Sequence, residues 1–424
     1  MSNEYDVIGV GFGPSNIALA VALQEKYPES NFVFLEKRAR VDWQPNMLLS
    51  GSDIQNNPLR DFVTPRNPKS HYGFINYLKE QNRLFDFLNL PLHYPLRSEY
   101  AGYVRWVASH FKNNVILNAE VESVTYDRTS SEYPWVISSK EGTTYRTKNL
   151  IWGTGREPNI PEVYKHALGD SVFHLNDFES KITIGEDETE TIAVLGASQS
   201  AVEIILDLAN RYPDKKIISI QRGFGFRLKD TSPFSDHVYF PDFVSYYHAL
   251  EPEKRKSLDR QLRGTNYSSA DADVINSLYV KIYEEKLHGK NRIIILNNTE
   301  VLSIKEGTSG KISVGLREVN TEETSSINVD KFVLATGFKD IALGEKGEKY
   351  PNKMESIYPL LNKDKDGVMV IERNYEAKFI GNVKSNLYLN GLCESSHGLG
   401  DAGSFSLLSI RSEVIADSIY DDSK

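Results

Sequence analysis

The chain has 424 residues, of which 40% are hydrophobic and 25% charged, and its formal net charge is −9. This length is too great for one compact core, so we expect two or three domains. The acidic balance argues against nucleic acid or an anionic membrane as the main partner, although a phosphate-rich cofactor needs only local donors.

Cys393 is the single cysteine. It excludes an intramolecular disulfide, a CxxC redox pair and a thiolate metal cluster, and we expect no metal site. No basic or apolar leader precedes the first predicted strand, and no apolar run approaches the roughly 20 residues that span a bilayer. We therefore expect a soluble cytoplasmic protein.

The first predicted strand, residues 5–10, runs directly into a glycine-rich turn, "GVGFGPSN", and an alanine- and leucine-rich helix. Glycines at such a turn let the backbone approach a pyrophosphate, and the start of the helix attracts its charge. Glu36, at the end of the next predicted strand, suits hydrogen bonding to an adenosine ribose. An ordinary glycine turn is the alternative, but this setting favours nucleotide binding by Gly9, Gly11, Gly13, Pro14, Ser15 and Glu36.

A second strand, turn and helix follows about 190 residues later, in "TIAVLGASQSAVEIILDLA". Serine replaces the second glycine of the fingerprint, so the motif is degraded, but its context favours a second dinucleotide. The next strand ends at Arg222, which either clamps a 2′-phosphate, as in NADP sites, or is a solvated surface arginine. The candidate residues are Gly196, Ser198, Gln199, Ser200 and Arg222.

Charged and aromatic helical segments fill residues 232–289, and residues 320–328 predict a polar hairpin or loop. The fold predicted is α/β, with two Rossmann-like dinucleotide-binding domains and a helical substrate-binding insertion. We expect the first nucleotide domain at residues 1–165 and 330–424, the second at 166–235 and 290–329, and the insertion at 236–289. Two nucleotide sites on a chain that returns to its first domain suggest a flavin that is reduced by a nicotinamide.

The motifs now resemble those of a known family, over nearly the whole length. They are "GVGFGPSN", "DWQPNM", "PKSHYGFINYLKEQNRL", "EYAGYVRW", "GTGREPNIP", "GASQSAVE", "DTSPF", "TNYS", "DKFVLATGF" and "SSHGLGDAGSFSLLSIRS". The chain resembles the microbial N-hydroxylating flavin monooxygenases, the L-ornithine and L-lysine N-monooxygenases of siderophore biosynthesis. The tryptophan segment, "TNYS" and the final segment are the most particular to that family.

The resemblance implies FAD in the first domain, NADPH in the second, and a primary amine in the helical region. In the family, NADPH reduces FAD, O2 gives a flavin C4a-hydroperoxide, and that species hydroxylates the neutral amine. By similarity, Gln55 lies near the flavin and the nicotinamide, and Asn266 contacts NADP+ and the amine. Family position alone places Trp43, Asp401 and Ser409 near the flavin, and a homotetramer is what the family suggests.

Departures from the family concern the substrate. Members that take ornithine hold its carboxylate with a lysine and an asparagine, and the matching positions here are Arg60 and Asp236. Aspartate beside a carboxylate costs affinity unless a cation intervenes. Either Arg60 and Asp236 pair with each other, or Asp236 faces a carboxylate-free amine such as putrescine, cadaverine or histamine. The segment "AGSF", residues 402–405, is also inserted before "SLLS" in the expected wall of the site.

Two alternatives remain. A Baeyer–Villiger or S-oxygenating flavin monooxygenase shares the "ATGF" strand, but the Baeyer–Villiger fingerprint is out of register at Gly169 and His174 and has Phe178 in place of tryptophan. A non-catalytic NADP-binding sensor would keep the fold without the oxygenase chemistry.

Overall fold

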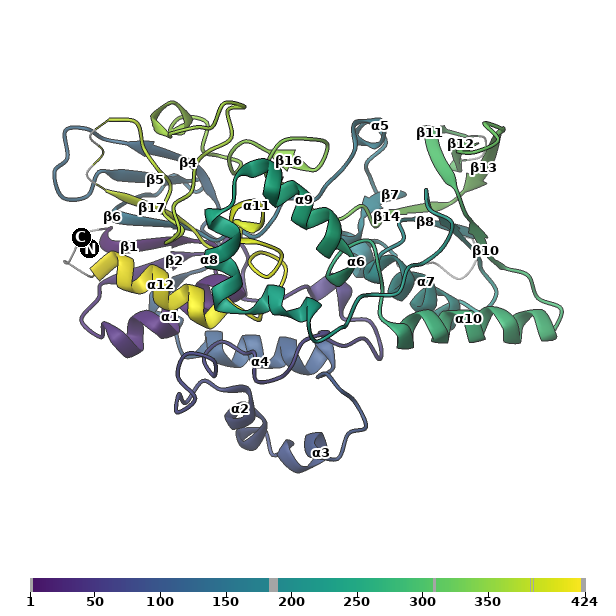
Figure 1. Cartoon of the computed structure of the whole chain (residues 1–424), viewed down its shortest axis with the longest axis horizontal. Helices are drawn as coiled ribbons and strands as arrows, with labels where there is room; N and C mark the ends of the chain where they lie inside the picture. Colours follow the sequence, from purple (N-terminus) through teal and green to yellow (C-terminus); the bar gives the residue numbers. More distant parts are fainter. Residues whose placement is uncertain (1–2, 183–189, 308–309, 382, 384, 421–424) are drawn as a thin grey trace.

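The structure is a computed structural model that describes residues 3–182, 190–307, 310–381, 383 and 385–420. It contains two large sheets, each flanked by helices and lying at opposite ends of the molecule (Figure 1). The N-terminal and C-terminal ends lie close together beside the first sheet. This arrangement confirms the predicted α/β fold with two Rossmann-like units.

The first sheet is assembled around the N-terminal strand, β1. In this sheet β1 pairs in parallel with β2 and β6, β6 pairs in parallel with β17, and β4 and β5 form an antiparallel extension. Its members are β1 (Glu4–Val10), β2 (Phe32–Leu35), β3 (Val115–Ile116), β4 (Val121–Tyr126), β5 (Trp135–Ser139), β6 (Thr144–Trp152) and β17 (Asn386–Leu389). Because β17 comes from near the end of the chain, the last residues complete the first domain.

One helix of the first domain is buried over most of its length. In α1 (Pro14–Lys26) every residue from 16 to 23 is buried, which explains its alanine- and leucine-rich sequence. It packs against the C-terminal helix α12 (Leu408–Tyr420) and lies near α4 (Arg97–Ser109). The short helices α2 (Phe74–Glu80) and α3 (Leu84–Leu88) project below them (Figure 1).

The second sheet is wholly parallel, in the order β10-β9-β8-β14-β7. The strands are β7 (Val172–His174), β8 (Thr191–Leu195), β9 (Lys216–Ile220), β10 (Ile293–Leu296) and β14 (Lys331–Leu334). Helices α7 (Gln199–Arg211) and α10 (Ala272–Leu287) pack together beside it. They cover one face of the sheet, and apolar residues of the segments 299–306, 312–318 and 324–329 cover the other, as the apolar sequences of the strands require.

A separate antiparallel sheet of β11 (Thr299–Glu306), β12 (Ile312–Glu318) and β13 (Thr324–Val329) covers part of the second domain. The polar segment expected at 320–328 thus becomes a turn followed by most of β13. A two-stranded bridge, β15 (Asp340–Ile341) and β16 (Gly347–Glu348), follows. The short helices α5 (Glu162–Lys165) and α6 (Phe178–Lys181) lie near the second sheet.

The structure moves the expected domain boundaries. The chain crosses between the domains twice. The two crossing segments lie side by side, as the antiparallel bridge between Pro158 and Phe338 shows. Strand β14 belongs to the second sheet, so the assignment of residues from 330 onward to the first domain is wrong at this strand. "KFVLATGF" ends in a glycine turn like the first-domain strands do, and this likeness concealed which sheet it joins.

The region expected to be helical is helical. It holds α8 (Pro241–Ala249), α9 (Pro252–Leu262) and α10, of which α8 and α9 cross the front of the molecule between the sheets (Figure 1). Helix α8 packs against the short α11 (Glu394–His397) of the first domain, whereas α10 packs on α7 of the second.

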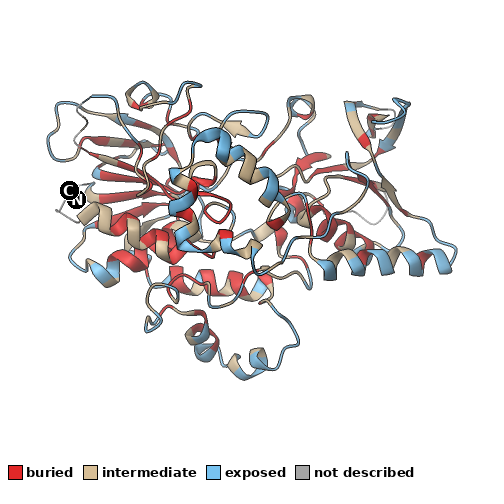
Figure 2. Ribbon diagram, in the orientation of Figure 1, coloured by how far each residue is buried: buried red, intermediate tan, exposed pale blue. Residues whose placement is uncertain are grey.

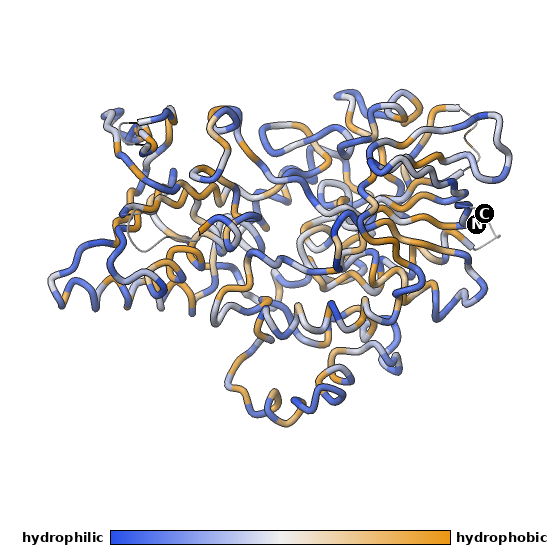
Figure 3. Tube along the Cα trace, turned by 180° about the vertical axis from the view of Figure 1, so that it is seen from behind, coloured by the Kyte–Doolittle hydropathy of each residue, from blue (hydrophilic) through white to orange (hydrophobic). Residues whose placement is uncertain are grey.

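Burial is concentrated in the two sheets and in α1, α4, α7 and α12 (Figure 2), and the same strands form the apolar interior seen from behind (Figure 3). No helix within the described residues has the length and apolar character that crossing a bilayer would need.

Candidate functional site

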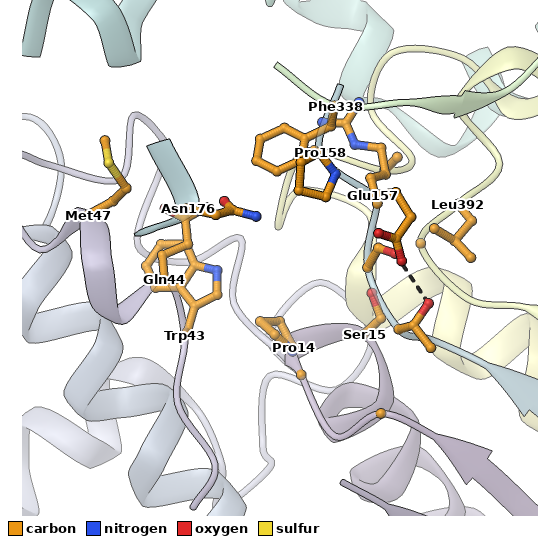
Figure 4. A pocket seen from close by; sticks show the side chains of 18 of the residues that line it. Pro14, Ser15, Trp43, Gln44, Met47, Glu157, Pro158, Asn176, Phe338 and Leu392 are labelled. Carbon is orange, nitrogen blue, oxygen red and sulfur yellow. Dashed lines mark hydrogen bonds between the residues drawn. The ribbon is translucent and has the colours of Figure 1, made fainter. Parts of the chain in front are cut away.

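A cavity of about 1370 Å³ lies between the two domains. The turn after β1, the end of β6, the segment 42–60, the start of α7 and the segment 402–408 all line it. Figure 4 shows Trp43 and Asn176 on one side, Glu157 and Leu392 on the other, and Pro14 and Ser15 between them. The cavity thus joins the carboxyl ends of strands from both sheets, where open α/β folds bind ligands.

The turn after β1 brings backbone close to backbone. Gly11 has a φ of +82°, and a Cβ on it would lie 2.8 Å from the carbonyl oxygen of Gly153. Asn16 holds the turn from inside, because its Nδ2 donates to the carbonyls of Val10 (3.2 Å) and Gly11 (2.7 Å). Pro14 is the first residue of α1, where its missing N–H costs no hydrogen bond.

Glu36 directly follows β2 and lies beside this turn. Its Oε2 accepts from the backbone N–H of Phe12 (2.9 Å) and its Oε1 from that of Arg38 (3.0 Å). These two bonds hold the carboxylate at the cavity wall with acceptor capacity to spare. Gly9, in contrast, lies within β1 away from the cavity, and a Cβ there would lie 2.2 Å from the ring of Phe34. Strand packing therefore accounts for Gly9.

Asp401 and Ser409 are buried behind the cavity rather than in its wall. Asp401 Oδ1 lies 2.8 Å from Arg411 Nη1, and Arg411 in turn donates from Nη2 to Ser15 Oγ (3.1 Å). Asn390 donates to the backbone carbonyl of Ser15 (3.0 Å). Sequence reasoning missed Arg411 and Asn390; an arginine inside the apolar "SLLSIRS" helix was the available signal.

The second glycine turn is as tight as the first. A Cβ on Gly196 would lie 2.6 Å from the carbonyl oxygen of Ala335, so Gly196 allows β8 and β14 to end close together. Ser198 caps α7 by its backbone, while Gln199 and Ser200 line the cavity. Arg222 is exposed beyond the end of β9 and does not line the cavity, so its role stays a prediction.

The segment that carries Gln55 is held by an ion pair that sequence reasoning missed. Arg97, at the start of α4, binds Glu203 of α7 through two contacts of 2.9 and 2.8 Å, and both side chains are buried. Arg97 also donates to the carbonyls of Met47 (2.9 Å) and Asp53 (3.1 Å). Gln55 has a φ of +53°, and its Nε2 is buried with no hydrogen-bond partner among the residues that the structure describes.

The network extends from Glu203 to the segment that carries Asn266. Gln199 Nε2 donates to Glu203 (3.0 Å), and Gln199 Oε1 accepts from the backbone N–H of Asp271 (2.8 Å). The side chain of Gln199 is therefore a connector between α7 and the "TNYS" segment. Its backbone N–H donates to the carbonyl of Ser269 (3.0 Å).

Arg60, Asp236 and Asn266 line the same cavity. Arg60 donates from Nη1 to Ser406 (3.3 Å), and its guanidinium carbon lies 5.8 Å from the ring centre of Tyr239. No hydrogen bond or ion pair to the Asp236 carboxylate occurs among the described residues, so the expected alternative of an Arg60–Asp236 pair is wrong. Asn266 Nδ2 reaches the carbonyl of Leu399 at 3.5 Å.

A polar cluster around the buried Glu394 lies next to Asn266. Arg156 Nη1 lies 2.9 Å from Tyr267 Oη, 3.1 Å from Asp340 and 3.3 Å from Glu394, and Tyr267 donates to Glu394. Tyr267 belongs to "TNYS" and Arg156 to "GTGREP", so two family motifs meet here. Because Asn266 precedes Tyr267 directly, this cluster fixes the backbone from which Asn266 projects.

The cavity thus brings together most of the predicted residues and leaves out some. Gly9, Gly196, Ser198, Arg222, Asp401 and Ser409 do not line it. Those that do are Gly11, Gly13, Pro14, Ser15, Glu36, Trp43, Gln55, Arg60, Gln199, Ser200, Asp236 and Asn266.

Known proteins share this sequence and architecture. The chain is 34% identical to an L-ornithine N(5)-monooxygenase of Pseudomonas aeruginosa over 98% of this chain and 94% of that one. A solved structure of the reduced ornithine hydroxylase from the same organism has a TM-score of 0.90 at 33% identity, covering 99% of this chain and all of that one. A Kutzneria ornithine N-hydroxylase, whose structure holds reduced FAD, NADP+ and L-ornithine, has a TM-score of 0.91 at 29% identity, covering 99% and 100%.

A family model matches residues 3–340, well over half of the chain. This match and the relatives above confirm the resemblance drawn from the motifs, and they identify an amine-hydroxylating monooxygenase rather than a sensor without activity. The chain therefore belongs to the L-lysine 6-monooxygenase/L-ornithine 5-monooxygenase family.

Proposed function

We propose that the protein uses FAD and NADPH to N-hydroxylate a primary amine that carries a second, cationic nitrogen. The observation that carries this proposal is the meeting of Gln55, Arg60, Asp236 and Asn266 in one cavity that reaches both glycine turns. Such a substrate is an ornithine- or lysine-like amino acid or a diamine. The hydroxylamine product would serve siderophore biosynthesis, as in the family.

The residues present fit both cofactors. The open space at Gly13 and the start of α1 suit the FAD pyrophosphate, and Glu36 has acceptor capacity for the ribose. The start of α7 suits the pyrophosphate of NADPH. The buried, unpartnered Nε2 of Gln55 is a donor without an acceptor, which a ring or amide oxygen of a cofactor would supply.

When bound, FAD supplies the oxygen-activating chemistry that NADPH drives. The chain's own residues bind and orient the reactants and exclude water from the site between the domains. Asn266, held by its contact with Leu399 and by its neighbour Tyr267, would orient the reacting amine. The aromatic groups of Trp43 and Phe405, whose centres lie 5.1 Å apart, make one wall apolar.

The far end of the substrate would lie at Arg60 and Asp236. Both charges act on two tyrosines, Tyr94 and Tyr239. Burial raises the pKa of each tyrosine, the charge of Asp236 raises it further, and the charge of Arg60 lowers it. Neither Arg60 nor Asp236 has a counter-ion among the described residues. A second nitrogen of the substrate would neutralise Asp236, and the carboxylate of an amino acid would neutralise Arg60.

A Baeyer–Villiger or S-oxygenating reaction is the remaining alternative, and no residue of the cavity favours it. His174, the histidine nearest to that fingerprint, is buried and bonded to the carbonyl of Gly337 at 2.9 Å. Burial lowers its pKa to about 4, so it is neutral at pH 7.

The test is a product assay for hydroxylamine, run beside NADPH oxidation, with ornithine, lysine, putrescine, cadaverine and histamine. Butylamine and 5-aminopentanoate serve as controls, because each has the reacting amine without a second cationic nitrogen. We expect product from at least one substrate with two nitrogens and little from either control. Equal product from butylamine would contradict the role of Asp236, and no product from any amine would contradict the function.

The variant Asp236→Asn tests how the second nitrogen is bound. We expect kcat/KM for putrescine and cadaverine to fall about tenfold, because the amide keeps an acceptor but lacks the negative charge that strengthens the bond to a cationic nitrogen. Ornithine should lose less or gain, since the change also removes repulsion from its carboxylate. Asp242→Asn, an exposed aspartate on α8, is the matched control and should leave both rates unchanged.

A further inference from the structure

The segment 402–406 connects the two polar ends of the cavity. Its residues line the cavity between Arg60 on one side and Asn266 on the other. The sequence resemblance predicts that four of them, 402–405, are an insertion relative to the family motif. Three separate sets of contacts hold this segment, and each leads to a different part of the site.

Phe405 anchors the segment in the first domain. Its ring centre lies 4.8 Å from that of Tyr100, 5.1 Å from Trp43 and 5.7 Å from Phe62. The edge-on angles of 82° to Tyr100 and 85° to Trp43 are the favourable geometry for aromatic pairs. Only 8% of Phe405 is exposed, so it is part of the core of this domain as well as of the cavity wall.

At Gly403 the segment packs closely against the "TNYS" side of the site. A Cβ at this position would lie 3.1 Å from Arg156 Nη2, 3.3 Å from Tyr267 Oη and 3.7 Å from Asn266 Nδ2. Arg156 Nη1 bonds to both Tyr267 and Glu394, and Tyr267 donates to Glu394, so the groups that face residue 403 are held in place and have little room to yield. The backbone at residue 403 therefore borders the space directly beside Asn266.

Ser406 joins the segment to Arg60. Its Oγ accepts from Arg60 Nη1 (3.3 Å) and from Ser404 Oγ (2.9 Å), and it donates to Asn56 Oδ1 (3.1 Å). The backbone N–H of Ser406 also donates to Ser404 Oγ (3.0 Å). These bonds hold the guanidinium of Arg60 in place through a serine hydroxyl.

We propose that residues 402–406 are a specificity-determining wall that selects the substrate by the length of carbon chain between its two nitrogens. The wall fixes Arg60 through Ser406 and borders Asn266 through Gly403, while Phe405 prevents it from moving outward. The spacing of the two polar ends is therefore set by this segment. This proposal rests on the proposed function, since it assumes that the amine extends from Asn266 toward Arg60 and Asp236.

The experiment compares kcat/KM across α,ω-diamines of three to six carbons and across ornithine and lysine. Wild type should show one preferred length. We expect Phe405→Ala to reduce its preference over the next longer homologue by roughly tenfold, the discrimination that one methylene commonly gives. Phe405→Leu is the matched control, because it keeps an apolar anchor and should keep most of the preference.

Ser406→Ala provides a second variant that leaves the aromatic anchor intact. Releasing Arg60 should also weaken the length preference, with less effect on folding. Binding is measured independently, as the shift in the thermal unfolding midpoint of the oxidised FAD and NADP+ complex with each amine. Folded Phe405→Ala and Ser406→Ala variants that keep the wild-type length preference would overturn the proposal.

A failure of the proposed function would look different. Wild type would then give no hydroxylamine from any amine, whatever the state of the wall. The binding series would still show whether the preferred length changes in the variants, so the two failures are distinguishable.

Discussion

Asp53 is a carboxylate at the cavity with no cation within 4 Å among the described residues, and it accepts one hydrogen bond, from the backbone N–H of Gln55 (2.9 Å). Burial raises its pKa to about 6, and the nearby carboxylates of Asp273, Asp271 and Glu203 add to the rise. An unpaired, partly buried negative charge lowers the free energy of unfolding. Its position at the cavity beside Gln55 indicates a role in function rather than in stability. It contributes to the negative potential that attracts a cationic amine.

Replacing this residue gives a pH-dependent prediction. An unfolded aspartate titrates near 3.8 and the native one near 6, so between these values the native state binds more protons and stability falls as pH rises. The loss is complete above pH 6. Asp53→Asn has no titrating group at this position and therefore no such pH-dependent loss, and it keeps an acceptor for Gln55. The variant should be more stable than wild type at pH 8, and this advantage should be smaller at pH 5.

The measurement is urea unfolding of the protein without added cofactors at both pH values. Asp170→Asn is the control, because this aspartate is 98% exposed and should give no pH-dependent difference. An advantage of Asp53→Asn that is equal at pH 5 and pH 8 would show that the pKa of Asp53 is not raised.

At the scale of elements, three segments of the site are tied by one buried network. Arg97 of α4 joins the carbonyls of the 47–53 segment to Glu203 of α7, and Gln199 continues the connection to Asp271. The distances between Gln55, the start of α7 and Asn266 are therefore not free to vary independently. A loop and two helices from different domains form one rigid support.

Removing one partner of this network should be costly. Arg97→Met leaves Glu203 as a buried carboxylate without its cation, which typically costs about 3–5 kcal/mol. The double variant Arg97→Met, Glu203→Met should recover much of that loss. Arg83→Met is the matched control, because Arg83, just before α3, pairs with Glu99 of α4 at 2.7 Å but is 44% exposed. That change should cost less than about 1 kcal/mol.

Denaturant unfolding checks these values, and hydrogen exchange locates the effect. Faster exchange should appear in residues 45–55 and 199–203 of Arg97→Met. If exchange becomes faster only in α4 and is unchanged elsewhere, Arg97 does not couple the domains.

Local patterns explain which elements were predictable. Apolar runs that end in glycine predicted β1, β6 and β8, because the signals for the strand and for the turn that ends it lie within a few residues of each other. The sheet that β14 joins, and the pairing of β17 with β6, depend on partners more than 130 residues away. The Arg97–Glu203 pair, 106 residues apart, was not predictable because a buried ion pair leaves no periodic signal. Asp401 and Arg411 are only ten residues apart, but the sequence does not show that their side chains meet.

The candidate site was predicted largely through the family motifs. They placed Gln55, Arg60, Asp236 and Asn266 in one cavity, although these residues come from three separate parts of the chain. They could not reveal whether Arg60 and Asp236 pair, because that depends on where Ser406 and Tyr239 hold the guanidinium. Side-chain directions inside the cavity come from tertiary packing alone.

At the scale of the whole molecule, the two ends of the chain build the first nucleotide site together. Helix α12 packs along α1, where Lys26 pairs with Glu413 (3.0 Å) and with Asp417 (2.7 Å). Deeper in the interface, Arg411 binds Asp401 and reaches Ser15 at the start of α1. The glycine turn near the N-terminus therefore takes its final shape only when the last helix is in place.

Arg411→Met tests this dependence on the chain's end. Asp401 would become a buried carboxylate without a cation, so we expect a loss of about 3–5 kcal/mol in the free energy of unfolding. Because Ser15 also loses its partner, FAD should be retained less well, seen as a lower ratio of absorbance at the flavin band to that at 280 nm after gel filtration. The double variant Asp401→Asn, Arg411→Met removes the buried charge and should regain stability without regaining FAD. Lys26→Met, which breaks only the exposed pairs of the same interface, should change neither quantity appreciably. Full FAD retention in a folded Arg411→Met protein would show that the first turn is shaped without help from α12.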